Sequence, residues 1–221
     1  MPSFTQDEAT HYDSRIERLV PGYQLLHELV QAQLQTVLPQ EAQILIVGAG
    51  TGKEVLQLAH SNPHWTFIVQ DVSDDMLAIA DQNFTNYGLS ERVTIHSGPL
   101  ESGQYQADVA LCLLVMHFVP DNGAKLALLA SIHSNLKPGK QLLLADLMKP
   151  ETLFERESQL KHCRAMGLTA VGEERMRYNL EHEFYPLDRI RLAELLDESG
   201  FSSAHMFFKA LGFSGLTCVR Q

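Results

Sequence analysis

A glycine-rich turn is the clearest sign of chemistry in this chain of 221 residues. Gly48, Gly50 and Gly52 are separated by single residues; they follow an apolar run and precede a helical pattern. Glycine lets the backbone approach a ligand closely, and a helix N-terminus offers unpaired N–H groups. Dinucleotide-binding folds use G-x-G-x-x-G, whose third glycine would fall at Lys53. The spacing therefore favours S-adenosyl-L-methionine (SAM) over NAD, bound by Gly48, Ala49, Gly50 and Gly52.

An acidic residue ends the next apolar run. Asp71 lies about 20 residues beyond Gly52, where nucleotide-binding α/β folds place a ribose-binding carboxylate. A carboxylate there can accept hydrogen bonds from both ribose hydroxyls. Helix capping is the alternative role, but Ser73 and Asp74 already supply a cap. We therefore predict that Asp71 binds the ribose.

The elements that would position these residues alternate between strand and helix. Short β-branched and aliphatic runs predict buried strands, and helical patterns lie between them. The predicted strands are 43–47, 66–69, 93–95, 109–114 and 141–146, and the predicted helices are 52–60, 74–87, 122–136 and 187–199. Pro138-Gly139 predicts a turn before the fifth strand. This alternation indicates right-handed crossovers, with helices on both faces of a parallel sheet.

The two ends and one insertion complete the expected fold. Residues before 40 have helical periodicity, which Pro21-Gly22 interrupts, and residues 151–180 are helical and polar. The last strands, 204–209 and 213–220, are joined across Leu211-Gly212. We predict a doubly wound, mostly parallel, seven-stranded α/β sheet with a C-terminal β-hairpin and a helical lid. The predicted parts are a helical cap (1–40), a SAM-binding core (41–150), a lid (151–185) and a closing helix and hairpin (186–221).

Four segments resemble, in order and spacing, the successive sequence blocks of class I SAM-dependent methyltransferases. They are ILIVGAGTGKEV, VQDVSDDMLAIA, ADVALCLLVMHFV and LKPGKQLLLADL. The resemblance extends from about Tyr12 to the C-terminus. It implies a Rossmann-like fold, SAM as cofactor, and methyl transfer to a small-molecule acceptor. Where the family often has Gly-Asp near the adenine, this chain has Gly98-Pro99. The further residues that it implies at the cofactor are Tyr23, Val72, Met76, Gly98, Leu100 and Leu113.

Three aromatic side chains are candidates around the reacting groups. Many small-molecule methyltransferases of this superfamily have a histidine where His117 stands, just after the fourth strand. It could orient a substrate or act as a base, because imidazole titrates near neutrality. A packed histidine bonded to backbone fits the sequence equally well. Tyr12 and Tyr23 could cover the methionyl end of the cofactor and contact substrate, or simply pack their helices.

Two segments are similar to the carboxy-SAM synthases, which convert SAM and prephenate into carboxy-SAM. These segments are 18–23 and 207–216. Arg177-Tyr178 falls where that family has an Arg-Tyr pair that holds the added carboxylate, and a guanidinium can bind a carboxylate through two parallel hydrogen bonds. This resemblance makes Arg177 a substrate-binding candidate, makes Tyr178 a catalytic one, and implies a homodimer. The loop GAGTG and Leu113 depart from that family, and Arg177 also fits a solvated helix face.

Composition narrows the choice of partners. Acidic residues outnumber basic ones by 27 to 17, giving a net charge of −10, so direct nucleic-acid binding is not expected. No apolar stretch reaches the roughly 18 residues of a membrane span, and the first residues lack a signal-peptide pattern. The three cysteines fit reduced, buried thiols, and no metal-ligand spacing is found. We expect a cytoplasmic enzyme with a small-molecule substrate and neither a membrane partner nor a metal.

Two functions of other classes fit parts of the same sequence. A non-catalytic SAM-binding protein would keep the glycine loop, and His117 and Tyr178 would be dispensable in it. A NAD-dependent oxidoreductase is disfavoured by Lys53 and by the terminal hairpin.

Overall fold

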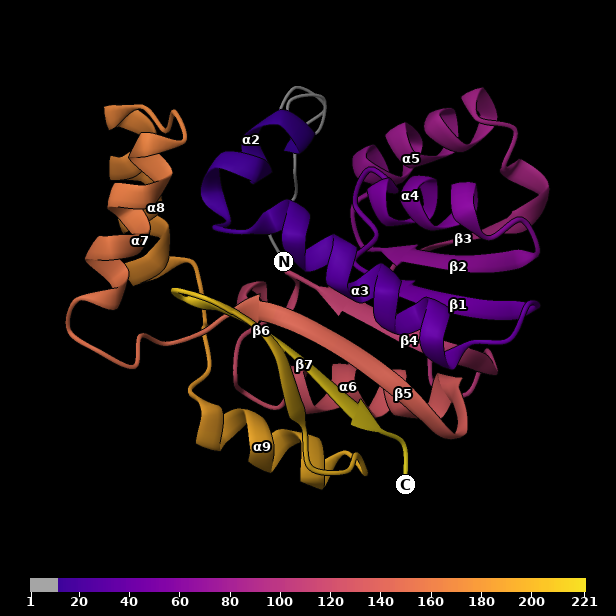
Figure 1. The fold of residues 1–221 in the computed structure, drawn as a ribbon. Coiled ribbons are helices and arrows are strands. Elements are labelled where there is room, and N and C mark those ends of the chain that lie inside the picture. The colour runs from indigo at the N-terminus through magenta and orange to yellow at the C-terminus, as the bar shows by residue number, and fades with distance from the viewer. Residues whose placement is uncertain (1–11) are drawn as a thin grey trace.

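A seven-stranded sheet with helices on both faces forms the framework of residues 12–221, the part of the chain that the computed structural model describes (Figure 1). The strands are β1 (Ala42–Val47), β2 (Trp65–Asp71), β3 (Val93–Ser97), β4 (Ala107–Leu113), β5 (Leu136–Leu147), β6 (His205–Ala210) and β7 (Phe213–Val219). Their spatial order is β3-β2-β1-β4-β5-β7-β6. β1 to β5 are parallel, whereas β7 is antiparallel to β5 and β6. The predicted fold class is confirmed.

Alternate residues of the central strands enter two separate hydrophobic cores. In β1, Ile44 and Ile46 join one core, and Leu45 and Val47 join the other. Helices α3 (Tyr23–Val37), α4 (Lys53–Ser61) and α5 (Asp74–Asn86) cover the first face, and α6 (Ala124–Asn135) and α9 (Arg189–Glu198) cover the second. Burial on both faces explains the continuous apolar runs in the sequence.

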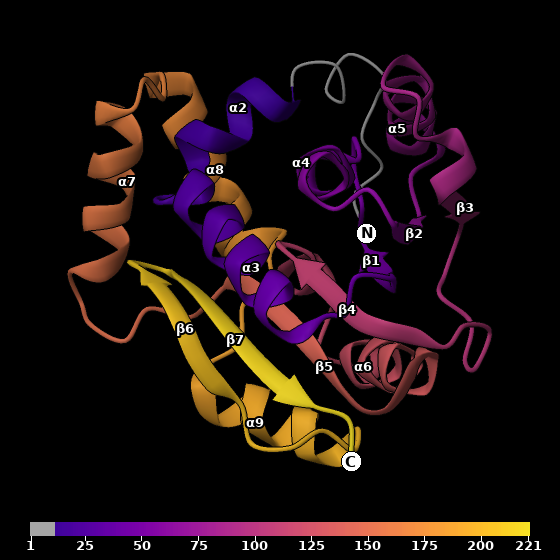
Figure 2. The same ribbon diagram turned by 45° about the vertical axis from the view of Figure 1, so that its right-hand side comes forward.

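Three further helices lie beyond the carboxyl ends of the parallel strands, as Figures 1 and 2 show from two sides. They are α2 (Tyr12–Leu19), α7 (Glu155–Ala165) and α8 (Ala170–His182). The break between α2 and α3 falls at Pro21-Gly22, as predicted, and Gly22 has a φ of 72°. The thiol of Cys163 in α7 donates to the Leu19 carbonyl at 3.4 Å, which joins the lid segment to α2.

The predicted turn at Pro138-Gly139 is wrong as a strand boundary. β5 begins at Leu136, and its pairing with β4 jumps from Ala107↔Leu136 to Val109↔Gln141. The intervening residues form a bulge, where Gly139 has a φ of 73° and donates its N–H to the Arg220 carbonyl. The structure also contains two short 3₁₀ helices that we did not predict, η1 (Ser90–Arg92) and η2 (Met116–Phe118).

Within residues 12–221, no helix is both long enough and apolar enough to cross a membrane. Residues 1–11 of the predicted cap lie outside the described part of the chain.

Candidate active site

The glycine loop is held to the end of β2 by backbone hydrogen bonds. The N–H groups of Gly48 and Ala49 both donate to the Gln70 carbonyl, at 2.8 and 2.9 Å. The N–H of Gly50 donates to Oδ2 of Asp71 at 2.8 Å. The loop and the predicted ribose acid are thus parts of one hydrogen-bonded unit, next to the point between β1 and β4 where the strand order reverses. Open α/β sheets bind ligands at such a point.

The two sides of the glycine loop differ. A β-carbon at Gly48 would overlap Cγ2 of Val115, so the loop packs tightly against the segment that follows β4. A β-carbon at Gly50 would meet no protein atom within 4 Å. The loop therefore rests on the β4 segment and leaves open space at Gly50 for the backbone to meet a ligand.

Asp71 keeps hydrogen-bonding capacity for a ligand. Its Oδ1 accepts from the Ser73 N–H at 3.0 Å, and its Oδ2 accepts from Gly50. Each carboxylate oxygen has two acceptor sites, so each can accept one more hydrogen bond. Ser73 caps α5 by accepting from the Met76 N–H, as the sequence indicated. The helix cap is therefore not the role of Asp71.

The segment predicted to meet the adenine is already partly engaged. The N–H of Gly98 donates to the Asp71 carbonyl, and its carbonyl accepts from Nε2 of Gln70 at 2.6 Å. Pro99 has no N–H. A backbone donor for the adenine in this segment would therefore have to come from Leu100. Of the other predicted neighbours, Met76 and Leu113 are buried and Val72 is exposed.

His117 is paired with an acid that we did not predict. Its Nδ1 is hydrogen-bonded to Oδ1 of Asp146, and this oxygen also accepts from the Leu147 N–H at 2.8 Å. Both side chains are buried. The pair places the proton of the neutral imidazole on Nδ1, which leaves the lone pair of Nε2 as a proton acceptor. The imidazole is thus bonded to a carboxylate, and the role of His117 stays a prediction.

Aromatic rings and a strained residue fix the surroundings of His117. The rings of Phe118 and Phe184 lie 4.0 and 4.9 Å from the imidazole, centroid to centroid. The carbonyl of His117 accepts from the Tyr185 N–H at 2.7 Å. Leu114, which precedes this segment, has a φ of 62°, a conformation that costs free energy in a leucine and occurs often at functional sites.

A buried lysine of α6 donates a hydrogen bond to the segment that contains His117. Lys125 in α6 has no exposed surface, and its ammonium donates to the Met116 carbonyl at 2.5 Å. Burial lowers the pKa of Lys125, and the nearby Asp146 opposes that change. We did not predict this residue, because a lysine in a helical pattern usually marks an exposed face.

The N-terminal helices contact the start of α4 through polar side chains. Thr51 donates its hydroxyl to Asp13 at 2.8 Å, and Lys53 pairs with Glu17 at the same distance. The ammonium of Lys53 also lies 4.7 Å above the ring of Tyr23. Tyr23 is buried, and burial followed by the charge of Glu54 raises its pKa. Tyr23 thus lies beside the start of α4, and its predicted contact with the cofactor stays a prediction.

Glu54 and His27 form the centre of this contact. Burial, reinforced by Asp13, raises the pKa of Glu54 to about 7. Burial followed by the charge of Lys53 lowers the pKa of His27 to about 4, and its Nδ1 lies 3.9 Å from Oε1 of Glu54. The same Glu54 raises the pKa of Tyr12, after burial. Tyr12 is therefore part of the cluster at the start of α4.

Arg177 and Tyr178 both lie in α8, where Arg177 is ion-paired and Tyr178 is exposed. Arg177 binds Glu157 of α7 through two hydrogen bonds, of 2.7 and 2.9 Å, and Glu173 at 3.0 Å. Tyr178 is 55% exposed and packs on the ring of His182. Only Arg177 lines the cavity under the lid.

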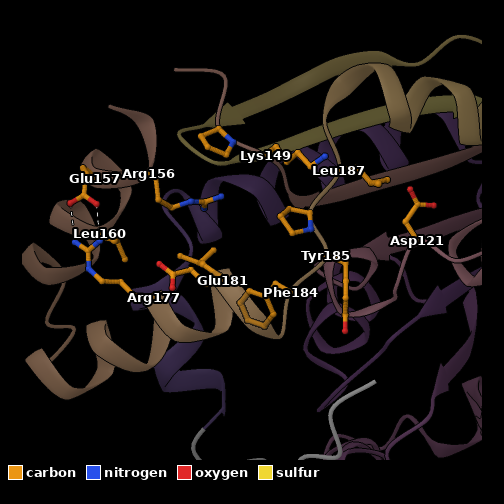
Figure 3. Close-up of a pocket in the computed structure, with 13 residues that line it drawn as sticks. Asp121, Lys149, Arg156, Glu157, Leu160, Arg177, Glu181, Phe184, Tyr185 and Leu187 are labelled. Atoms are coloured by element: carbon orange, nitrogen blue, oxygen red, sulfur yellow. Dashed lines mark hydrogen bonds and ion pairs between the residues drawn. The ribbon is translucent and has the colours of Figure 1, made fainter. Parts of the chain in front are cut away.

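That cavity has a volume of about 610 Å³ and lies between α7, α8 and the loops after β5 and before α9 (Figure 3). Phe184 and Tyr185, the two neighbours of His117 from the loop before α9, also line it. In the part of the chain that the structure describes, no three His, Cys, Asp or Glu residues are grouped to hold a metal ion.

Comparison with known proteins shows which proteins this chain resembles. Residues 45–141 match the model of a methyltransferase domain. A carboxy-S-adenosyl-L-methionine synthase of Methylococcus capsulatus is 25% identical over 98% of this chain and 93% of its own length. Residues 45–141 thus resemble a methyltransferase domain, and the fold is that of the class I methyltransferases.

Solved structures agree on the fold. Magnesium protoporphyrin IX methyltransferase of Synechocystis, solved with bound SAH, has a TM-score of 0.65 and 19% identity over 90% of this chain and 84% of that one. The methyltransferase SibL has a TM-score of 0.66 and 18% identity over 89% of this chain, which spans 55% of its length. With the domain match, they support SAM as the cofactor or substrate, as predicted.

The structure brings the glycine loop, Asp71 and His117 to one edge of the sheet. The sequence interpretation missed Asp146, although an acid that ends an apolar strand was a usable signal. It also missed Glu54, which lies in the first turn of the helix that follows the glycine loop. The roles predicted for Arg177 and Tyr178 stay predictions.

Proposed function

We propose that this chain transfers the methyl group of SAM to a small-molecule acceptor whose nucleophilic atom loses a proton. The observation that carries the proposal is the buried His117–Asp146 pair. His117 lies two residues after Val115, which packs on Gly48 of the glycine loop. A paired imidazole at the carboxyl edge of the sheet has the position expected of a proton acceptor beside a ligand in the crevice.

The residues around the glycine loop fit the cofactor. Asp71 has acceptor sites left for the two ribose hydroxyls, and Gly50 offers open space to the methionyl part. SAM carries positive charge on its sulfonium and ammonium groups. Asp13 and Asp71 both act electrostatically on Glu54, and the negative charge of this group of acids favours a cation.

The protein's part in the reaction is alignment and proton transfer. SAM supplies an activated methyl group, so no further activation of the donor is needed. A bond forms between the nucleophilic atom and the methyl carbon, while the carbon–sulfur bond breaks and leaves its electron pair on sulfur. The proton of the nucleophile passes to Nε2 of His117, and Asp146 stabilises the resulting imidazolium. Phe118 and Phe184 exclude water from the ring.

A direct test begins with the purified protein. Mass spectrometry identifies any small molecule released by mild denaturation, and formation of S-adenosylhomocysteine (SAH) is then followed with a panel of small hydroxyl, amine and thiol acceptors. SAM or SAH on the protein and acceptor-dependent turnover support the proposal. SAM binding without turnover on the whole panel would favour a non-catalytic SAM-binding protein, and NAD in place of SAM would overturn the assignment.

A second candidate is an enzyme that acts on SAM itself, like the carboxy-SAM synthases. The observation in its favour is the likeness to those enzymes along nearly the whole chain. Against it, Arg177, which should hold the added carboxylate, is bound to Glu157 and Glu173. Carboxy-SAM among the released molecules would make this the preferred function, and its absence alongside SAH formation would exclude it.

A further inference from the structure

The cavity under the lid is lined by six ionised side chains, three of each sign, of which five have a partner of opposite charge or lie at the exposed rim. Arg177 and Glu157 are paired with each other. Lys149 lies 3.3 Å from Asp188, and Asp121 binds Arg191 at 3.0 Å. The carboxylate of Glu181 is largely exposed, 3.8 Å from His182.

Arg156 is the exception. Its guanidinium extends toward the centre of the cavity (Figure 3) and is partly buried. Nη1 donates to Oε1 of Gln159 at 2.8 Å and Nη2 to the Met148 carbonyl at 3.2 Å, and both acceptors are uncharged. Within residues 12–221 it makes no ion pair, because its neighbour Glu155 binds Lys209 at 2.9 Å. A guanidinium has five N–H donors, so hydrogen-bonding capacity remains.

Gln159 and the β6–β7 turn restrict the position of Arg156. Gln159 is completely buried, and its Nε2 has no hydrogen-bond partner in the described structure. A β-carbon at Gly212, in the β6–β7 turn, would overlap Oε1 of Gln159 and lie 3.1 Å from Nη1 of Arg156. The hairpin turn therefore limits the movement of this pair. The neighbouring Glu155 acts on Arg156 electrostatically but is bound to Lys209, and a partly buried positive charge without an ion-pair partner is stabilised when a ligand supplies one.

The rest of the wall is largely apolar and includes Phe184, which contacts His117. Leu160 and Leu180 come from the lid helices, and Phe184, Pro186 and Leu187 come from the loop before α9. Phe184 also packs edge-on against the imidazole of His117. A ligand in this cavity would thus have an apolar body near the proposed proton acceptor and a charged end at Arg156.

We propose that this cavity is the acceptor pocket, and that it takes a small molecule with a carboxylate on an apolar body, the carboxylate being bound by Arg156. This inference rests on the proposed function, because the ligand is a methyl acceptor only if the chain transfers methyl groups. Arg156 is then the specificity-determining residue: a fork of N–H groups selects a planar carboxylate over a neutral amide of the same shape. The volume of about 610 Å³ lies within the range of pockets for small molecules.

Calorimetric titration of the full chain in the presence of SAH tests the inference. The probes are two acid–amide pairs of different length, 4-hydroxybenzoate with 4-hydroxybenzamide and phenylacetate with phenylacetamide. The variants are Arg156→Gln, Arg156→Lys and, as a control, Lys161→Gln. Lys161 is an exposed cation on α7 that does not line the cavity. The wild type should bind at least one acid about 10- to 100-fold more tightly than its amide, the loss expected for one charge-assisted contact.

The preference for the acid should disappear in Arg156→Gln, remain in part in Arg156→Lys, and be unchanged in Lys161→Gln. If neither acid binds more tightly than its amide, or if the preference survives in Arg156→Gln, the inference is overturned. SAH binding, measured in the same titrations, reports both folding and the proposed function. A wild type that binds the acids but not SAH would contradict the proposed function while leaving Arg156 a carboxylate site.

Discussion

The ring of Phe84 fills the space beside Gly52, so that a β-carbon on Gly52 would lie 2.5 Å from two ring atoms. Gly50, in the same loop, would meet no protein atom at all within 4 Å. Both glycines have positive φ, of 79° and 53°. One glycine thus allows α4 to begin against α5, and the other keeps space open for a ligand.

Alanine substitutions should separate these two roles. Gly52→Ala and Gly50→Ala share the cost of a left-handed alanine, roughly 1–2 kcal/mol. Gly52→Ala should lose a further ~1–3 kcal/mol of unfolding free energy, because the methyl group displaces Phe84. Gly50→Ala should instead weaken SAH binding more than it weakens folding. Urea unfolding and calorimetry measure both quantities, and equal stability of the two variants would contradict the assignment.

Asp71→Ala should weaken SAM binding by about 2–4 kcal/mol, because the ribose hydroxyls lose a charged acceptor. Ser73→Ala is the matched control: it removes the cap of α5, at a cost of about 1 kcal/mol of stability, and leaves the ribose acid in place. Calorimetry with SAM compares the two. Unchanged affinity in Asp71→Ala would mean that the ribose lies elsewhere.

His117→Ala should lower kcat about 10²- to 10⁴-fold, because the proton acceptor is removed. Asp146→Asn should also lower kcat, because an amide in place of the carboxylate no longer holds the Nδ1–H tautomer. The control is His60→Ala, at the exposed end of α4. Steady-state rates and SAH affinity are measured together. Equal losses of SAH affinity and kcat would indicate a structural role for the pair.

The glycine loop and Asp71 could be predicted because their signals are local. A continuous aliphatic run ending at Gly48 describes a strand buried on both faces, and Asp71 ends the next such run. The strand boundary near Pro138 could not be predicted, since it depends on the distant C-terminal residues. The carbonyl of Lys140 accepts from the Arg220 N–H, and this contact continues the sheet pairing past the bulge.

The pairings at the site depend on contacts between segments far apart in the chain. Asp146 meets His117 because β5 lies beside β4 in a particular register, with Leu113 opposite Ala145. Arg177 meets Glu157 because α7 and α8 pack together. A single sequence does not reveal which side chains from distant segments meet.

Glu54→Gln should change how stability depends on pH. The pKa of Glu54 is raised from its ordinary 4.5 to about 7 in the folded chain, chiefly by burial. Between these values the unfolded chain has lost the proton and the folded chain keeps it, so this group lowers the unfolding free energy as pH rises. Glutamine has no such proton. The stability of Glu54→Gln relative to wild type should therefore rise from about pH 4.5 to 7, in total by on the order of 3 kcal/mol, and stay constant above.

His27 provides the opposite slope and serves as an internal reference for that experiment. Its pKa is lowered to about 4, mainly by burial, so the stability that it contributes is lost as pH falls from 6.5 towards 4. Both proteins contain His27, and the largest cause of its shift is burial, so most of its effect cancels in the difference. Urea unfolding of both proteins at half-unit steps from pH 4 to 8 gives that difference. Two parallel curves would show that folding does not raise the pKa of Glu54, and the acid would then carry its full negative charge beside the glycine loop at neutral pH.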